Sequence, residues 1–155
     1  MNDPSNIDVV VDINSLRLGT RNITGEVFLR INRDAFPETR WNDFVVIILG
    51  WWLRCLRELG TSGGIGDETV LYFMDGPFRL AVRKIADGGV TITGVLETQT
   101  TRHEVLKATC QLRDLLTPIL TSAELVHREC DNRGWKTDDS ETLLSEIEKT
   151  RSAGL

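Results

Sequence analysis

The strongest hydrophobic pattern in the chain runs from Trp41 to Gly60. Apolar side chains recur there every three or four residues, which is the spacing of one helix face. They are Trp41, Phe44, Val45, Ile48, Trp52, Cys55, Leu56 and Leu59. The other side holds only a narrow polar stripe of Asp43, Gly50, Arg54, Arg57 and Glu58. Such a helix needs cover on most of its circumference, so we expect it to be the core helix of a compact domain, with Gly60 as its C-terminal cap.

A membrane role for this helix is not favoured. The unbroken apolar run extends only from Phe44 to Leu49. A helix that spans a bilayer needs roughly 20 apolar residues. The flanks also lack the Lys/Arg clusters of an interfacial helix. The pattern therefore favours burial in a protein core.

Strict alternation of apolar and polar residues predicts strands on both sides of the core helix. Before it, 7–14 and 25–32 alternate around a turn at 19–22, which predicts an antiparallel hairpin. After it, a glycine-rich connection at 61–67 leads to three shorter predicted strands at 70–74, 78–83 and 90–96. Tight turns at Asp75-Gly76 and Asp87-Gly88-Gly89 separate these strands, so we expect a meander with short connections.

Two further helices are predicted at the C-terminal end. Thr101 and Glu104 have the spacing of a capping box and predict the start of a second long helix, which ends at 132–134. Its apolar stripe comprises Val105, Ala108, Leu112, Leu115, Leu116, Ile119, Leu120, Ala123 and Val126. Pro118 lies inside that stripe and either kinks the helix or splits it. Asp138 and Glu141 predict a second capping box, which opens a short helix with Leu143, Leu144 and Ile147.

The predicted order is ββαβββαα. Hairpins need no crossover helix, so the fold class we expect is α+β, with a five-stranded, mostly antiparallel sheet. Two long helices pack on one face of that sheet and make a two-layer structure. We expect residues 1–155 to form a single domain, with disordered ends at 1–5 and 151–155.

Composition narrows the choice of partners. The chain has 155 residues, of which 18 are basic and 23 acidic, so its net charge is -5. Phosphate binding needs a basic surface, so direct nucleic-acid binding is not favoured. A basic protein partner fits better. The three cysteines are an odd number, and the start lacks a basic, apolar signal segment, so we expect a reducing cytoplasm.

Candidate chemistry is sparse. The glycines at 60, 63, 64 and 66 follow a helix C-terminus, where the dipole has the wrong sign for phosphate. His127 and Cys130 lie three residues apart, with His103 and Cys110 upstream on the same predicted helix, but a second pair of zinc ligands is missing. Neither histidine lies in a nucleophile motif. We therefore expect no catalytic residue, no metal and no cofactor.

Acidic side chains are the candidate partner-binding residues. They are Asp8, Asp12 and Glu26 on the first hairpin and Asp67 and Glu68 in the glycine-rich connection. Asp8 and Asp12 also form a carboxylate pair on one strand face, which would serve glycosidase-type chemistry only inside a cleft. The plainer alternative for all five is ordinary solubility.

Three segments resemble small bacterial toxin-immunity proteins of the polymorphic or contact-dependent-inhibition type. They are Trp41-Asn42-Asp43-Phe44, Gly50-Trp51-Trp52-Leu53 and Phe73-Met74-Asp75-Gly76-Pro77, in the middle third of the chain. The resemblance implies a non-enzymatic protein that binds a cognate toxin domain, often a basic nuclease, and blocks its active site.

Two alternatives stay open. One is a small enzyme or ligand-binding domain with a pocket between sheet and helices that holds His103 or His127. The other is a homodimer joined through an open sheet edge.

Overall fold

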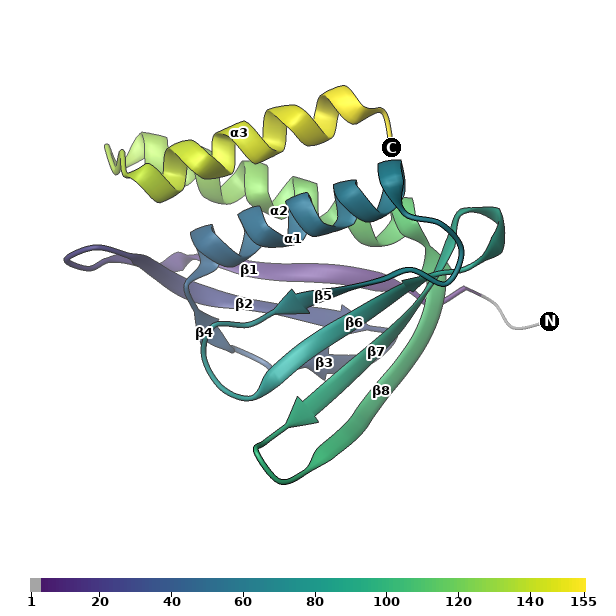
Figure 1. Ribbon diagram of the computed structural model, residues 1–155. Helices are drawn as coiled ribbons and strands as arrows, with labels where there is room; N and C mark the ends of the chain where they lie inside the picture. Colours follow the sequence, from purple (N-terminus) through teal and green to yellow (C-terminus); the bar gives the residue numbers. More distant parts are fainter. Residues whose placement is uncertain (1–3) are drawn as a thin grey trace.

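The computed structural model describes residues 4–155 and confirms the α+β class (Figure 1). The strands are β1 (Ile7–Leu18), β2 (Ile23–Ile31), β3 (Asp34–Phe36), β4 (Asn42–Asp43), β5 (Glu68–Tyr72), β6 (Phe78–Lys84), β7 (Gly89–Glu97) and β8 (Arg102–Gln111). The helices are α1 (Val45–Ser62), α2 (Leu112–Asn132) and α3 (Asp138–Ala153), with a short 3-10 turn at Ala86–Gly88. Figure 1 shows the three helices side by side above the strands.

The strands form two four-stranded antiparallel sheets, where the sequence predicts one sheet of five strands. In the β1–β4 sheet, β2 pairs with β1, β3 and β4. In the β5–β8 sheet, the strand order follows the chain. The predicted N-terminal hairpin is confirmed, with Val9 opposite Leu29. The very short β3 and β4 carry too few residues to produce a recognisable alternation.

The helix α1 is buried on most sides, as its pattern predicts. Trp52, Leu53 and Leu56 are fully buried. The helix packs against β5 and β2 and against both other helices. Its predicted ends are wrong: it begins at Val45 and is capped by Gly63, whose N–H donates to the Leu59 carbonyl. Gly60 is instead a close-packing position, because a Cβ there would lie 2.9 Å from Leu112 Cδ2.

Residues 102–111 form β8 and not the first turns of a helix, so the predicted capping box at Thr101 and Glu104 is wrong. The strand pairs with β7 along its whole length. Leu106, Ala108 and Cys110 alternate inward with period two, whereas Val105 lies at a bulge and is exposed. The helical spacing of Val105 and Ala108 is therefore a coincidence that long-range strand pairing overrides.

The two C-terminal helices differ in detail from the expectation. α2 runs without a break through Pro118, so the split does not occur. α3 has 16 residues, and its capping box is formed by Thr137 and Ser140, one residue earlier than predicted. α3 includes residues 151–153, for which the sequence predicts disorder. At the other predicted loose end, residues 1–3 lie outside the described part, and the Ser5 N–H donates to the Thr109 carbonyl at 2.9 Å.

One hydrophobic cluster contains side chains from both sheets and all three helices. Phe36 of β3 makes edge-to-face contacts with Phe73 and Phe78, which belong to the β5–β6 hairpin. The two sheets therefore turn their inner faces toward a common core, and their outer faces point away from each other. Among residues 4–155, no helix combines the length and apolar character needed to cross a bilayer.

Candidate functional site

Two of the segments that carry the resemblance meet at the buried carboxylate of Asp43, which is 3% exposed. This carboxylate accepts hydrogen bonds from Trp41 Nε1 (3.0 Å), the Phe44 N–H (2.7 Å) and the Asp75 N–H (3.2 Å). Gly76 has a φ of 77° and lies against the Trp41 ring, where a Cβ would be 2.7 Å from Cη2. These residues join β4 to the β5–β6 turn, so they link the two sheets.

The glycine-rich connection caps a helix. Lys84 Nζ donates to the carbonyl of Gly63 (2.7 Å) and lies 3.4 Å from the carbonyls of Leu59 and Gly60. These carbonyls lie at the C-terminus of α1, where a cation complements the helix dipole. The Asp67 carboxylate accepts the Gly64 N–H at 2.8 Å and holds the turn. The connection therefore presents carbonyl groups, which repel a phosphate.

The histidines and cysteines are dispersed. His103 lies on β8 and is exposed, whereas His127 lies on α2, 3.9 Å from Asp131, so the two do not share one helix as predicted. Within residues 4–155, no three His, Cys, Asp or Glu side chains are grouped as metal ligands would be. Cys110 and Cys130 are buried free thiols. Burial raises the pKa of the Cys110 thiol to about 11 and also raises the pKa of Cys130, so neither forms a reactive thiolate near neutral pH.

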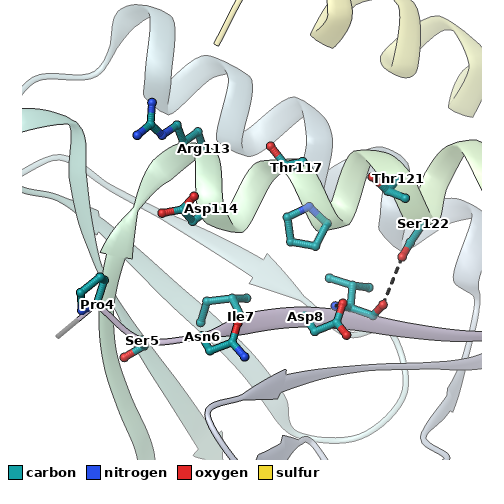
Figure 2. Close-up of a pocket in the computed structure, with 12 residues that line it drawn as sticks. Pro4, Ser5, Asn6, Ile7, Asp8, Arg113, Asp114, Thr117, Thr121 and Ser122 are labelled. Carbon is teal, nitrogen blue, oxygen red and sulfur yellow. Dashed lines mark hydrogen bonds between the residues drawn. The ribbon is translucent and has the colours of Figure 1, made fainter.

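A polar groove of about 640 Å³ lies between β1 and α2 (Figure 2). It is lined by residues 4–9 and by Arg113, Asp114, Thr117, Pro118, Thr121 and Ser122. Ser122 Oγ donates to the Val9 carbonyl at 3.3 Å, and the Asp8 carboxylate accepts the Val9 N–H at 2.9 Å. The groove runs beside the outer edge of β1, and neither histidine lines it.

The five acidic residues predicted to bind a partner do not form one surface. Asp8, Asp12 and Glu26 lie on the outer face of the β1–β4 sheet, where Asp12 stands opposite Glu26. Arg40 Nε donates to Glu26 at 2.9 Å, and this hydrogen bond together with the charges of Glu26 and Asp12 raises the pKa of the guanidinium.

The other two acidic residues lie at the β5–β8 sheet. Asp67 is bound within its own turn. Glu68 is exposed at the start of β5, with Arg83 Nε 3.8 Å away on β6. Glu68 alone of the five lines the groove described next.

A second groove, of about 370 Å³, lies between α1 and β5. We call it the α1–β5 groove; it is lined by Trp51, Arg54, Cys55, Glu68, Thr69, Val70 and Tyr72. Trp51 is 37% exposed and Tyr72 49%, and Met74, just beyond β5, is 45% exposed. Arg54 has no ion pair with any described residue and also borders a smaller groove between α1 and α3. Trp, Tyr and Arg are the side chains most enriched at protein-binding hot spots.

The acidic residues predicted from the sequence do not identify this groove, although the sequence contains a signal for it. Trp51 precedes Arg54 by three residues and Glu58 by seven, so it lies on the polar stripe and not on the apolar face. A tryptophan on the polar side of an otherwise buried helix indicates a surface that is occupied by something else. Tyr72 and Val70 give no such signal, because their outward direction depends on sheet pairing.

Comparisons with protein-family models, with curated proteins and with solved structures found no match. Neither the resemblance to immunity proteins nor its alternatives gain support from a relative. The functional inference therefore depends on the side chains of the α1–β5 groove and on the chemistry that they can perform, which is binding through aromatic and charged contacts.

Proposed function

We propose that the chain is a non-enzymatic binding protein of the immunity type. In this proposal it acts in the bacterial cytoplasm and neutralises a cognate toxin domain by covering that domain's active site. The observation that carries the proposal is the α1–β5 groove, where Trp51, Arg54 and Tyr72 stand exposed around the half-buried Val70 and Cys55. Exposed aromatic groups around an apolar floor favour a macromolecular partner.

The lining of the groove carries both signs of charge, with Arg54 on α1, and the acidic side chains on and near it fit a partner with a basic site. Glu68 lies on one wall, and Asp67 and Glu58 are exposed nearby along β5 and α1. The closest cation to Glu68 is Arg83, at 3.8 Å, which is a loose, solvent-exposed pair. Exposed pairs of this kind contribute only about 0–1 kcal/mol, so Glu68 can exchange Arg83 for a partner's cation at little cost.

The test uses the polypeptide encoded directly upstream of this chain, with binding measured by calorimetry and protection measured by survival of cells that express the toxin. Trp51→Ala is expected to weaken binding by about thirtyfold or more, since a central tryptophan contributes about 2 kcal/mol or more at an interface. Leu125→Ala is the matched control, because Leu125 on α2 is 38% exposed and lies away from the groove.

Three results would contradict the proposal. One is the absence of binding between the wild-type chain and that polypeptide. The second is equal affinity of the Trp51→Ala and wild-type proteins, which would place the interface elsewhere. The third is a toxin that remains active when fully bound, because a protein that does not block the active site gives no protection of the kind proposed.

A further inference from the structure

The outer edge of β5 carries backbone groups without partners. β5 is the end strand of its sheet and pairs only with β6. The Lys84 N–H donates to the Asp67 carbonyl at 2.8 Å, so residues 67, 69 and 71 direct their backbone groups toward β6. Glu68, Val70 and Tyr72 therefore direct theirs outward. Tyr72 uses its carbonyl to accept Trp52 Nε1 at 2.8 Å, and no other described residue bonds to the outward groups of Val70.

Each of the other sheet edges has some protection within the described part of the chain. α2 and the residue that follows it cover part of the β1 edge: Ser122 donates to the Val9 carbonyl, and Arg133 donates to the carbonyls of Ile13 and Leu16, whereas the outward groups of Ile7 and Val11 have no described partner. β8 has a bulge at Val105 and exposed charges at Arg102, Glu104 and Lys107, both of which disfavour pairing with another strand. β3 has only three residues. β5 has no bulge, proline or lysine, and an apolar groove runs beside it.

We infer that the α1–β5 groove takes an extended segment of a partner protein, which pairs with the backbone N–H and carbonyl of Val70 and lies between Trp51 and Tyr72. This inference rests on the proposed function and names how the partner is held. Main-chain hydrogen bonds supply affinity in such strand addition, and the flanking pockets supply specificity. The segment is short, because Trp52 occupies the Tyr72 carbonyl and the turn at Asp67 ends the edge.

A second copy of this chain fits the β5 edge less well than an extended segment without a flanking helix does. Two β5 edges paired about a two-fold axis would lie about 4.8 Å apart. α1 packs against β5 and lines the groove beside its edge, so the two copies of α1 would approach each other at the same place. Packed helices need about 8–10 Å between their axes. A single strand without a flanking helix avoids this collision.

Val70→Pro tests the pairing directly. The outward N–H of Val70 makes no bond to β6, so proline removes the group offered to the partner and leaves the sheet's own hydrogen bonds intact. Lys107→Pro is the matched control on β8. The Thr109 carbonyl points away from β7 and accepts the Ser5 N–H, so the backbone groups of residue 107, two positions earlier, also point outward. Val70→Thr retains the N–H and is the conservative control.

The probe is a displayed library of random peptides of about nine residues, longer than a typical strand. It is panned against the wild-type protein. Selected peptides are expected to bind Val70→Pro about three- to tenfold more weakly, because the hydrogen bond donated by the Val70 N–H is lost, and to bind the two control variants as they bind the wild type. In the wild type, amide exchange at Val70 should slow on adding a selected peptide, while exchange at Lys107 stays unchanged.

Three outcomes would each overturn the inference. They are a failure to select any binder, selected peptides that bind Val70→Pro as tightly as the wild type, and amide exchange at Val70 that does not change on adding a peptide. A wild-type dimer that Val70→Pro converts to a monomer would assign the edge to a second copy and would also overturn it. Toxin binding that survives Val70→Pro but not Trp51→Ala would leave the proposed function standing while this mode of binding fails. The exchange measurement uses the wild-type protein, so it decides the matter even if Val70→Pro does not fold.

Discussion

β1 and β5 are both end strands that lie beside a helix, but their outer edges differ. On β1, the backbone groups of Val9 bond to Ser122 and Asp8, and the guanidinium of Arg133 donates to the carbonyls of Ile13 and Leu16 at 3.0 and 3.3 Å. On β5, the Tyr72 carbonyl, which accepts the Trp52 indole N–H, is the only outward group with a partner among the described residues 4–155.

The difference shows how the same arrangement of helix and strand can serve two purposes. α2 and Arg133 turn polar side chains toward β1 and bond to the carbonyls of Val9, Ile13 and Leu16, so that region contributes to stability. α1 turns Trp51, Arg54 and Cys55 toward β5 and leaves a groove with exposed aromatic rings. Exposed apolar area and free backbone groups contribute nothing to the isolated fold, and they favour association with another chain.

The largest effect is expected from breaking the contact that α1 does make with β5. Trp52→Ala removes a fully buried side chain and its hydrogen bond to Tyr72, and should lower the free energy of unfolding by about 3–5 kcal/mol. Denaturant unfolding measures this. Trp51→Ala, one residue earlier and 37% exposed, is the matched control and should unfold almost as the wild type does. An equal decrease in the free energy of unfolding of both variants would refute the contrast between the two tryptophans.

Opening the β1 edge should have a smaller effect. Arg133→Ala removes the donors to Ile13 and Leu16, the 2.8 Å ion pair with Glu129 and the stacking on Trp135, and should cost about 1–2 kcal/mol. We also expect new self-association, visible by sedimentation, because an uncovered edge can pair. Arg128→Ala is the control, since Arg128 is exposed on the same helix without a described ion pair. A monomeric Arg133→Ala variant of wild-type stability would show that β1 needs no cover.

Neutralising the acidic residues should hardly change stability, because exposed carboxylates contribute about 0–1 kcal/mol. Asp67→Asn with Glu68→Gln should nevertheless slow association with the toxin domain, and added salt should remove the difference. Asp8→Asn with Asp12→Asn should leave binding unchanged, because these residues lie on the other sheet's outer face. If the Asp8/Asp12 variant associates with the toxin domain more slowly than the Asp67/Glu68 variant does, the interface lies on the β1–β4 sheet.

The smallest effect is expected from labelling the cysteines, a test that needs no substitution. In the native protein Cys55, which lines the α1–β5 groove, should react with a thiol reagent before the buried Cys110 and Cys130, and a bound partner should protect it. All three should titrate as free thiols in denatured, unreduced protein.

The raised pKa of Cys110 adds a pH dependence. The unfolded thiol ionises near 9.0, whereas the folded one keeps its proton to about 11, so the folded state binds more protons in this window. The free energy of unfolding should therefore fall as pH rises from about 9 to 11. If the free energy of unfolding of a Cys110→Ala variant falls equally over this pH range, the pH dependence belongs to other groups. Fast labelling of Cys110 by a thiol reagent at neutral pH would show that β8 opens.

Much of the fold could be predicted from local pattern. Alternation from Ile7 identified the hairpin, and the apolar spacing around Trp52 identified a helix buried on most sides. Both signals are strong because a half-buried strand and a core helix impose their own periods on the sequence. The α+β class follows from these elements and from the short turns between the later strands.

The candidate site was much less predictable. The five acidic residues share a charge, but only Glu68 lies at the α1–β5 groove. Local pattern gives the face on which a residue lies along its own element and does not say which element covers that face. Trp51 could be placed opposite the core side of α1 from sequence, whereas its proximity to Val70 and Tyr72 could not.

Residues 102–111 show where local sequence pattern is not enough and contacts between distant residues decide the structure. Their sequence fits a capped helix as well as a strand, and pairing with β7 selects the strand. The division of eight strands into two sheets, the polar cover on β1 and the free edge of β5 depend likewise on contacts between residues distant in the chain. Local sequence pattern shows which surfaces are apolar and which segments have a regular period. Which of these surfaces are covered depends on tertiary contacts, because the covering element is another part of the chain whose position no local period encodes.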